Sequence, residues 1–136
     1  TLTDSSAASD VYKRQELVVA DIPGLIEDAH KGDGLGFKFL KHIERCHSII
    51  HVIDVTDEDV KKSYNTITSE LNNYDGNITK KNKIVVLNKC DLIDKEEIKI
   101  KKNILENETQ LQVYTISTIT GEGVSNLINH ILIIKN

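Results

Sequence analysis

The chain of 136 residues has the length of a single domain, and its 39% hydrophobic and 28% charged residues are typical of a globular protein rather than a disordered one. Its formal net charge of −4 argues against a broadly basic surface for nucleic acid. No apolar run approaches the roughly 18 residues of a membrane-spanning helix, and no signal peptide is recognisable, so we expect no membrane association.

The segment Thr1–Gln15 differs in character from the rest of the chain. Its residues are mostly small and polar, and they show neither the period of a strand nor that of a helix. We interpret it as a tail outside the fold, either a flexible terminus or a segment foreign to the protein. The folded domain is therefore expected to comprise residues 16–136.

From Glu16 onward, short apolar runs rich in β-branched residues alternate with longer segments of helical spacing. The predicted strands are Leu17–Ala20, Ile49–Ile53, Ile84–Leu87 and Val113–Ile116. Their nearly continuous apolar character indicates strands that are covered on both faces. The predicted helices are marked by Phe37, Leu40 and Ile43, by Val60, Tyr64, Ile67 and Leu71, by the charged stretch Asp94–Asn107, and by Val124, Leu127, Ile128, Ile131 and Leu132. This alternation predicts an α/β fold with a parallel sheet and flanking helices.

Polar, turn-forming clusters follow three of the predicted strands. Asp21-Ile22-Pro23-Gly24 follows the first strand, Asn88-Lys89-Cys90-Asp91 follows the third, and Ser117-Thr118 follows the fourth. In an open parallel sheet, ligands bind beyond the carboxyl ends of the strands. We therefore expect these clusters to converge on one site.

The cluster Asn88–Asp91 suits the recognition of guanine. A carboxylate such as that of Asp91 accepts two parallel hydrogen bonds from the N1–H and the exocyclic amine of guanine, a donor pair that adenine lacks. Asn88 can tie neighbouring loops together, and the stem of Lys89 can lie flat against a base. An ordinary polar turn after a strand is the alternative, which the strand context and the Ser117-Thr118 pair disfavour.

The cluster Asp21–Gly24 suits the phosphate end of a nucleotide. A carboxylate at the end of a strand can hold Mg²⁺ through water. Gly24 lets a backbone N–H approach a terminal phosphate because no Cβ stands in the way. Taken alone, a simple Pro-Gly turn is the better explanation of these residues.

Two longer strings extend these motifs. The string Asp21-Ile-Pro-Gly-Leu-Ile-Glu-Asp-Ala-His30 is followed by Lys31-Gly-Asp-Gly-Leu-Gly-Phe-Lys-Phe-Leu-Lys-His-Ile-Glu-Arg45. Together they resemble the switch II region of the Obg family of GTPases. Asn88–Asp91, and Ser117 with the Thr-Gly-Glu-Gly that follows, resemble the base-contacting motifs of that family, and the resemblance extends from Glu16 to about Ile134.

The resemblance implies a P-loop-type GTPase domain of the translation-factor class, which hydrolyses GTP to GDP and phosphate with Mg²⁺. It implies that Asp21 contacts Mg²⁺ through water and that Gly24 contacts the γ-phosphate. It also implies a partner in the large ribosomal subunit during the assembly of that subunit. We expect the chain to be a monomer.

Guanine recognition is the role that the resemblance implies for Asn88, Lys89 and Asp91. The backbone around Ser117 and Thr118 would approach the O6 atom of the base. Thr118 departs from the family, which usually has a small alanine at that position, so the fit of this loop to a base is expected to be less close.

Two positions in the switch II region also bear on activity. Asp28 stands where the family pattern has glycine, and Leu25 stands where many small GTPases have a glutamine that orients water. An apolar side chain cannot orient water, so we expect slow intrinsic hydrolysis and assign no catalytic residue.

The chain contains no Gly-x-x-x-x-Gly-Lys-Ser/Thr motif. That loop supplies the backbone amides and the lysine that cradle the phosphates, and its hydroxyl binds Mg²⁺. In the resembled family it precedes the Asp-x-x-Gly motif. We therefore expect a sheet that is incomplete at its N-terminal side, and a fragment that keeps guanine recognition but does not hydrolyse GTP. The alternative is a catalytically dead fragment that acts only through protein contacts.

The chain has two cysteines, which lie far apart in the sequence, and a histidine within a predicted strand. Cys46 and Cys90 fit neither a zinc site nor a disulfide framework, which favours a reducing, cytoplasmic compartment. His51 interrupts a predicted buried strand, and we expect it to be a neutral, hydrogen-bonded core residue rather than a ligand.

Overall fold

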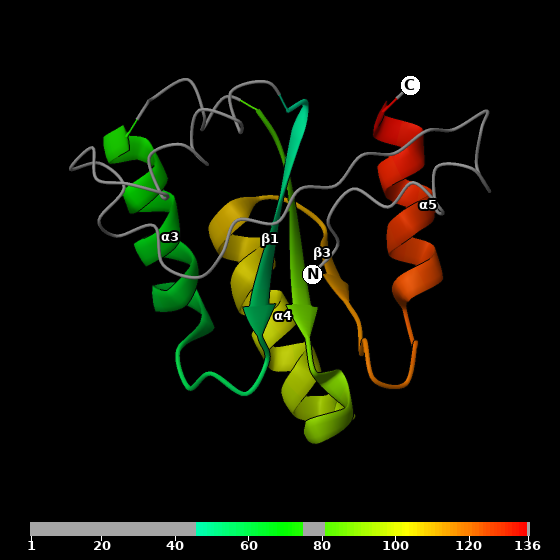
Figure 1. Cartoon of the computed structure of the whole chain (residues 1–136). Helices are drawn as coiled ribbons and strands as arrows, with labels where there is room; N and C mark the ends of the chain where they lie inside the picture. The colour runs from blue at the N-terminus through cyan, green and yellow to red at the C-terminus, as the bar shows by residue number, and fades with distance from the viewer. Residues whose placement is uncertain (1–45, 75–80, 136) are drawn as a thin grey trace.

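The computed structural model describes residues 46–74 and 81–135 of the chain. Within these ranges the elements are β1 (Ser48–Asp54), α3 (Val60–Tyr74), β2 (Asn82–Asn88), the 3₁₀ helix η3 (Cys90–Leu92), α4 (Lys95–Thr109), β3 (Val113–Thr115) and α5 (Val124–Lys135) (Figure 1). The predicted strand at 17–20, the predicted helix around 37–43 and the tail at 1–15 lie outside the described residues. For the remainder, the predicted alternation of strands and helices is confirmed.

The three described strands form one parallel sheet in the order β1-β2-β3. The register pairs Asp54 at the end of β1 with Asn88 at the end of β2, so both strands finish at the same edge. This arrangement confirms the predicted α/β class with a parallel sheet and flanking helices, and it fits a P-loop-type GTPase domain. Among the described strands, β1 pairs with β2 alone, so its other side is an edge of this sheet.

Two hydrophobic clusters lie on opposite faces of the sheet because side chains alternate along each strand. On one face, α3 and α4 pack over the sheet through the cluster Ile53, Val55, Val60, Tyr64, Val85, Leu87, Leu105 and Val113. On the other face, α5 packs over β2 and the end of β3 through Ile84, Val86, Ile116, Leu127 and Ile131. The central strand β2 is therefore buried on both sides, as its apolar run predicts.

β1 does not follow the prediction that every strand is covered on both faces. Val52 is 52% exposed, although its register partner Val86 is fully buried on the same face. The reason is the position of α5, whose apolar cluster centres on β2 and β3 and does not extend to Val52. The apolar run in β1 therefore predicts more burial than this strand has in the structure.

The charged helix α4 is solvated, as expected from its composition. It begins after Asp94, whose Oδ1 accepts a hydrogen bond from the Glu97 N–H at 2.8 Å. It ends at Gln110, which has a left-handed backbone with φ 58° and donates its N–H to the Glu106 carbonyl. Leu105 is its buried residue and fixes it to the sheet.

His51 lies in the middle of β1 on the face that α3 covers. Its ring stacks on Tyr64 of α3, with 5.2 Å between ring centroids and 20° between ring planes. Burial, and after it the positive charge of Lys83, lower the pKa of His51 from 6.5 to about 4. The histidine is therefore neutral near pH 7, as expected. The expectation of a hydrogen bond is wrong for Nδ1, which is buried without a hydrogen-bond partner among the described residues.

This environment predicts an acid-sensitive contribution of His51 to stability. The unfolded chain takes up the proton near pH 6.5 and the folded chain only near pH 4, so unfolding binds a proton between these values. The contribution is complete above pH 6.5, and the free energy of unfolding falls by up to about 3 kcal/mol as the pH drops to about 4. Urea unfolding across this range is the measurement. His51→Phe keeps a ring against Tyr64 but cannot titrate, so an equally steep profile in that variant would show that His51 is not the cause.

Both cysteines lie within the described residues. Cys46 is exposed and Cys90 is half-buried, and no disulfide joins them. The Cys90 Sγ lies 3.4 Å from the Leu87 carbonyl oxygen and packs against the core, and this burial raises the pKa of the thiol.

No helix in the described ranges combines the length and the apolar character needed to cross a bilayer.

Candidate functional site

The ends of β2 and β3 bring the cluster Asn88–Asp91 next to the residues that follow β3. The Cys90 N–H donates to the Ile116 carbonyl at 3.1 Å, and the Ile116 N–H donates to the Leu87 carbonyl at 2.8 Å. Both hydrogen bonds continue the pairing of β2 with β3 beyond Leu87 and Thr115, the last paired residues of the two strands. The predicted convergence of these two clusters is therefore what the structure shows.

Asp91 and Ser117 are joined directly by their side chains. The Ser117 hydroxyl donates to Asp91 Oδ1 at 2.8 Å and accepts a hydrogen bond from the Thr120 N–H at 3.1 Å. Ser117 is 1% exposed, so it is a fixed anchor, whereas Asp91 is exposed. Asp91 Oδ2 has no hydrogen-bond partner among the described residues. Ser117 thus holds one carboxylate oxygen, which keeps a second lone pair, and the other oxygen is open, so each oxygen can accept from one member of an incoming pair of donors.

Asn88 ties three segments of the chain together at this edge. Its Oδ1 accepts a hydrogen bond from the Thr118 N–H at 3.2 Å. Its carbonyl oxygen accepts one from the Val55 N–H at 3.0 Å, in the loop that follows β1. The linking role that the sequence suggests for Asn88 is therefore present. The Thr118 N–H is already engaged, so a guanine O6 atom would have to share or replace this hydrogen bond.

Lys89 adopts a left-handed backbone conformation, with φ 67° and ψ 31°, and starts the 3₁₀ helix η3. Its ammonium group forms an ion pair with Asp54 Oδ2 at 2.9 Å. This contact raises the pKa of Lys89, chiefly through the hydrogen bond and then through the charge of Asp54. That the stem of Lys89 lies against a base stays a prediction.

Asp54 is the residue of this edge that sequence reasoning missed. The polar clusters after the other predicted strands were recognised, but the single aspartate after Ile49–Ile53 was not. The available signal was its position, because a charged residue that directly follows a buried parallel strand lies at the same edge as the other clusters.

The loop between β3 and α5 is held in one shape by backbone hydrogen bonds and two glycines. The Ser117 N–H donates to the Glu122 carbonyl at 3.0 Å, and the Gly121 N–H donates to the Ser117 carbonyl at 2.7 Å. Gly121 and Gly123 have φ values of 84° and 78°, which side-chain-bearing residues rarely adopt. A Cβ at Gly123 would collide with the Thr115 carbonyl oxygen, whereas one at Gly121 would meet nothing within 4 Å.

The predicted phosphate and magnesium residues, Asp21 and Gly24, lie outside the described residues. Within the ranges 46–74 and 81–135 there is no group of three or more His, Cys, Asp or Glu side chains arranged to hold a metal ion. The described site is therefore confined to the base-binding side of the predicted nucleotide site.

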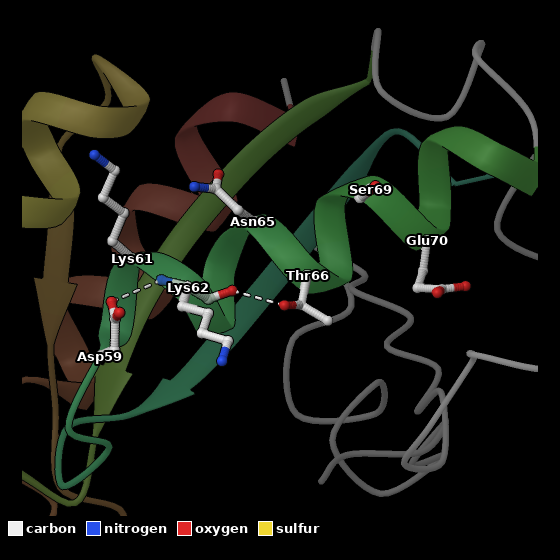
Figure 2. Close-up of a pocket in the computed structure, with 7 residues that line it drawn as sticks. All are labelled: Asp59, Lys61, Lys62, Asn65, Thr66, Ser69 and Glu70. Carbon is white, nitrogen blue, oxygen red and sulfur yellow. Dashed lines mark hydrogen bonds between the residues drawn. The ribbon is translucent and has the colours of Figure 1, made fainter.

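A hollow lies along α3 and begins at Asp59, the residue before this helix. Figure 2 shows its lining, which consists of Asp59, Lys61, Lys62, Asn65, Thr66, Ser69 and Glu70. The hydrogen bonds drawn there are local to the helix, because Asp59 caps the Lys62 N–H and Thr66 donates to the Lys62 carbonyl. The described lining comes from α3 and the residue before it, so we assign no ligand to this hollow.

Sequence comparisons show that this chain is similar to known GTPases. The family described as 50S ribosome-binding GTPase matches residues 1–89. The chain is 51% identical to GTPase Obg of Rickettsia akari (strain Hartford) over 123 residues, which cover 90% of this chain and 37% of that protein. It is 52% identical to GTPase Obg of Ehrlichia ruminantium (strain Gardel) over 118 residues, 85% of this chain and 35% of that protein. For GTPase Obg of Pelagibacter ubique (strain HTCC1062), the identity is 46% over 117 residues, 85% of this chain and 36% of that protein. The chain thus spans little more than a third of the length of these relatives.

Proposed function

Because this chain belongs to the Obg family of GTPases, we propose that it carries the guanine-recognition side of a GTP-binding site. The observation that carries the proposal is the state of Asp91, which Ser117 holds at Oδ1 and which offers Oδ2 at the surface. A carboxylate held in this way is ready to accept two donors in one plane.

Guanine fits this acceptor through its N1–H and its exocyclic amine. Adenine has no such donor pair, and it would leave the carboxylate desolvated and unpaired. Asn88 holds the loop at Thr118 against the end of β2, which sets the distance between the two sides of the base site. The stem of Lys89 supplies an apolar surface for the face of the base.

For the whole protein, we propose hydrolysis of GTP to GDP and phosphate with Mg²⁺. Asp21 would contact the Mg²⁺ through water, and Gly24 would lie near the γ-phosphate. The matched family's description, 50S ribosome-binding GTPase, supports a partner in the large ribosomal subunit, and we propose a role in the assembly of that subunit. Because the 136 residues contain no Gly-x-x-x-x-Gly-Lys-Ser/Thr motif, we further propose that this polypeptide binds guanine without hydrolysing GTP.

The test is a titration of the ¹⁵N-labelled chain with guanosine, GDP and adenosine, followed by amide chemical shifts. Two charge-assisted hydrogen bonds of about 1.5–3 kcal/mol each correspond to a Kd on the order of 1 mM. Guanosine should shift the amides of Asp91, Ser117 and Thr118, and GDP should bind about as tightly because the phosphate-cradling motif is not in this polypeptide. Adenosine should give no saturable shift.

The outcomes separate the parts of the proposal. Equal binding of adenosine, or no guanosine binding up to about 10 mM by a folded chain, would contradict guanine recognition and favour a role through protein contacts alone. Release of phosphate from GTP above the buffer rate would contradict the inactivity of this polypeptide but would leave guanine recognition standing.

A further inference from the structure

Asp54 ends β1 beside the candidate guanine site and is fully engaged by two neighbours. Its Oδ1 accepts hydrogen bonds from the Thr56 N–H at 2.9 Å and from the Thr56 hydroxyl at 2.6 Å, while Oδ2 pairs with the Lys89 ammonium at 2.9 Å. The hydrogen bonds from Thr56 and Lys89 lower the pKa of Asp54 to about 2. The carboxylate is therefore charged and fixed in orientation at any pH near neutral.

The loop that carries Thr56 is held firmly against the rest of the fold. The Lys101 ammonium of α4 donates to the carbonyl oxygens of Val55 and Asp57, at 2.7 Å each. The Val55 N–H donates to the carbonyl of Asn88, the residue before Lys89. These contacts hold Asp54 in place relative to the end of β2, and the Lys89 ammonium pairs with its carboxylate.

A second carboxylate lies close to Lys89 along the chain, because Asp91 follows it by two positions in the short 3₁₀ helix η3 that Lys89 precedes. The ion pair that forms is with Asp54, and the charges that act on Lys89 are those of Asp54 and Asp57. If its ammonium turned to Asp91 instead, it would occupy the carboxylate that the base needs. Holding the side chain at Asp54 also orders a long, 53% exposed lysine before a ligand arrives, which removes part of the entropy loss on binding.

We propose that Asp54 is a positioning residue of the guanine site, which keeps the Lys89 ammonium off Asp91 and its stem in place for the base. This inference rests on the proposed function. Asp54 acts on the base through Lys89 and makes no contact with it. Its effect must therefore disappear when Lys89 has no ammonium group.

The experiment is a double-mutant cycle in the full chain, with guanosine as the ligand and amide shifts as the readout. Asp54→Asn keeps an oxygen for Thr56 and removes the charge that holds Lys89, so it should weaken guanosine binding about two- to fivefold, the range for an exposed ion pair. Lys89→Met keeps the apolar stem without the charge, and in this background Asp54→Asn should have no further effect. Asp59→Asn is the matched control, because Asp59 caps α3 without touching Lys89 and asparagine caps equally well.

A second readout needs no ligand. The carboxyl ¹³C signal of Asp54 should titrate near pH 2 in the wild-type chain and at a higher pH in Lys89→Met. If the wild-type chain does not bind guanosine, the proposed function is wrong and this inference with it. If the wild type binds and Asp54→Asn binds equally well, or keeps its full defect with Lys89→Met, only the positioning role is wrong.

Discussion

Replacing Asp91 with asparagine is expected to remove guanosine binding from this chain and to create binding of xanthosine. The asparagine oxygen can still accept a hydrogen bond from Ser117 and from the base N1–H. Its amide nitrogen, however, would face the exocyclic amine of guanine, donor against donor, at the position where Asp91 now offers an open oxygen. Xanthine has a carbonyl oxygen in place of that amine and accepts a hydrogen bond from the new amide.

The expected loss for guanosine is at least about 100-fold, since one hydrogen bond to a charged group is lost and a buried donor is left unpaired. Xanthosine should bind the variant within about tenfold of the affinity of wild-type chain for guanosine. Amide-shift titrations of guanosine and xanthosine against the wild-type chain and against Asp91→Asn measure this change of specificity. Asp94→Asn is the control, because Asp94 caps α4 through Glu97 and takes no part in the site. Unchanged guanosine binding by Asp91→Asn would mean that Asp91 does not read the base.

Replacing Gly123 with alanine is expected to destabilise the fold far more than the same change at Gly121. Both residues have a left-handed backbone, which costs alanine about 1–2 kcal/mol at either position. At Gly123 the new Cβ would also collide with the Thr115 carbonyl oxygen and lie 3.3 Å from Ile116 Cγ2. The backbone of β3 or of the loop must move, so we expect a total loss of about 3 kcal/mol or more from the free energy of unfolding.

The two glycine variants are also expected to differ in their effect on guanosine binding. Thr115 lies two residues before Ser117, so a shift of this strand end would disturb the hydrogen bond that orients Asp91. Gly123→Ala should therefore weaken guanosine binding in whatever fraction remains folded, whereas Gly121→Ala should leave it within about twofold, because its Cβ meets open space. Urea unfolding and the guanosine titration measure the two effects. Equal losses of stability at the two positions would show that the loop relaxes without strain.

Local patterns in the chain identified much of the described fold. The apolar run Ile84–Leu87 predicts a strand buried on both faces, and the structure confirms it because helices lie on each side of β2. The same kind of run in β1 predicts the strand correctly but not its burial. The exposure of Val52 depends on where α5 packs, and a pattern within β1 carries no information about a helix seventy residues later.

The convergence of Asn88–Asp91 with Ser117 was also predictable, because parallel strands that follow one another bring their carboxyl ends to one edge. The sequence by itself therefore determined the fold class, the family and the convergence of two polar clusters at one edge of the sheet. Only the tertiary structure decided which partner each charged group takes. Asp54 reads as one more turn residue in the sequence, and its ion pair with Lys89 arises from the register that sets β1 beside β2. Such pairings depend on distances of a few ångströms between separate segments, which the order of residues alone does not specify.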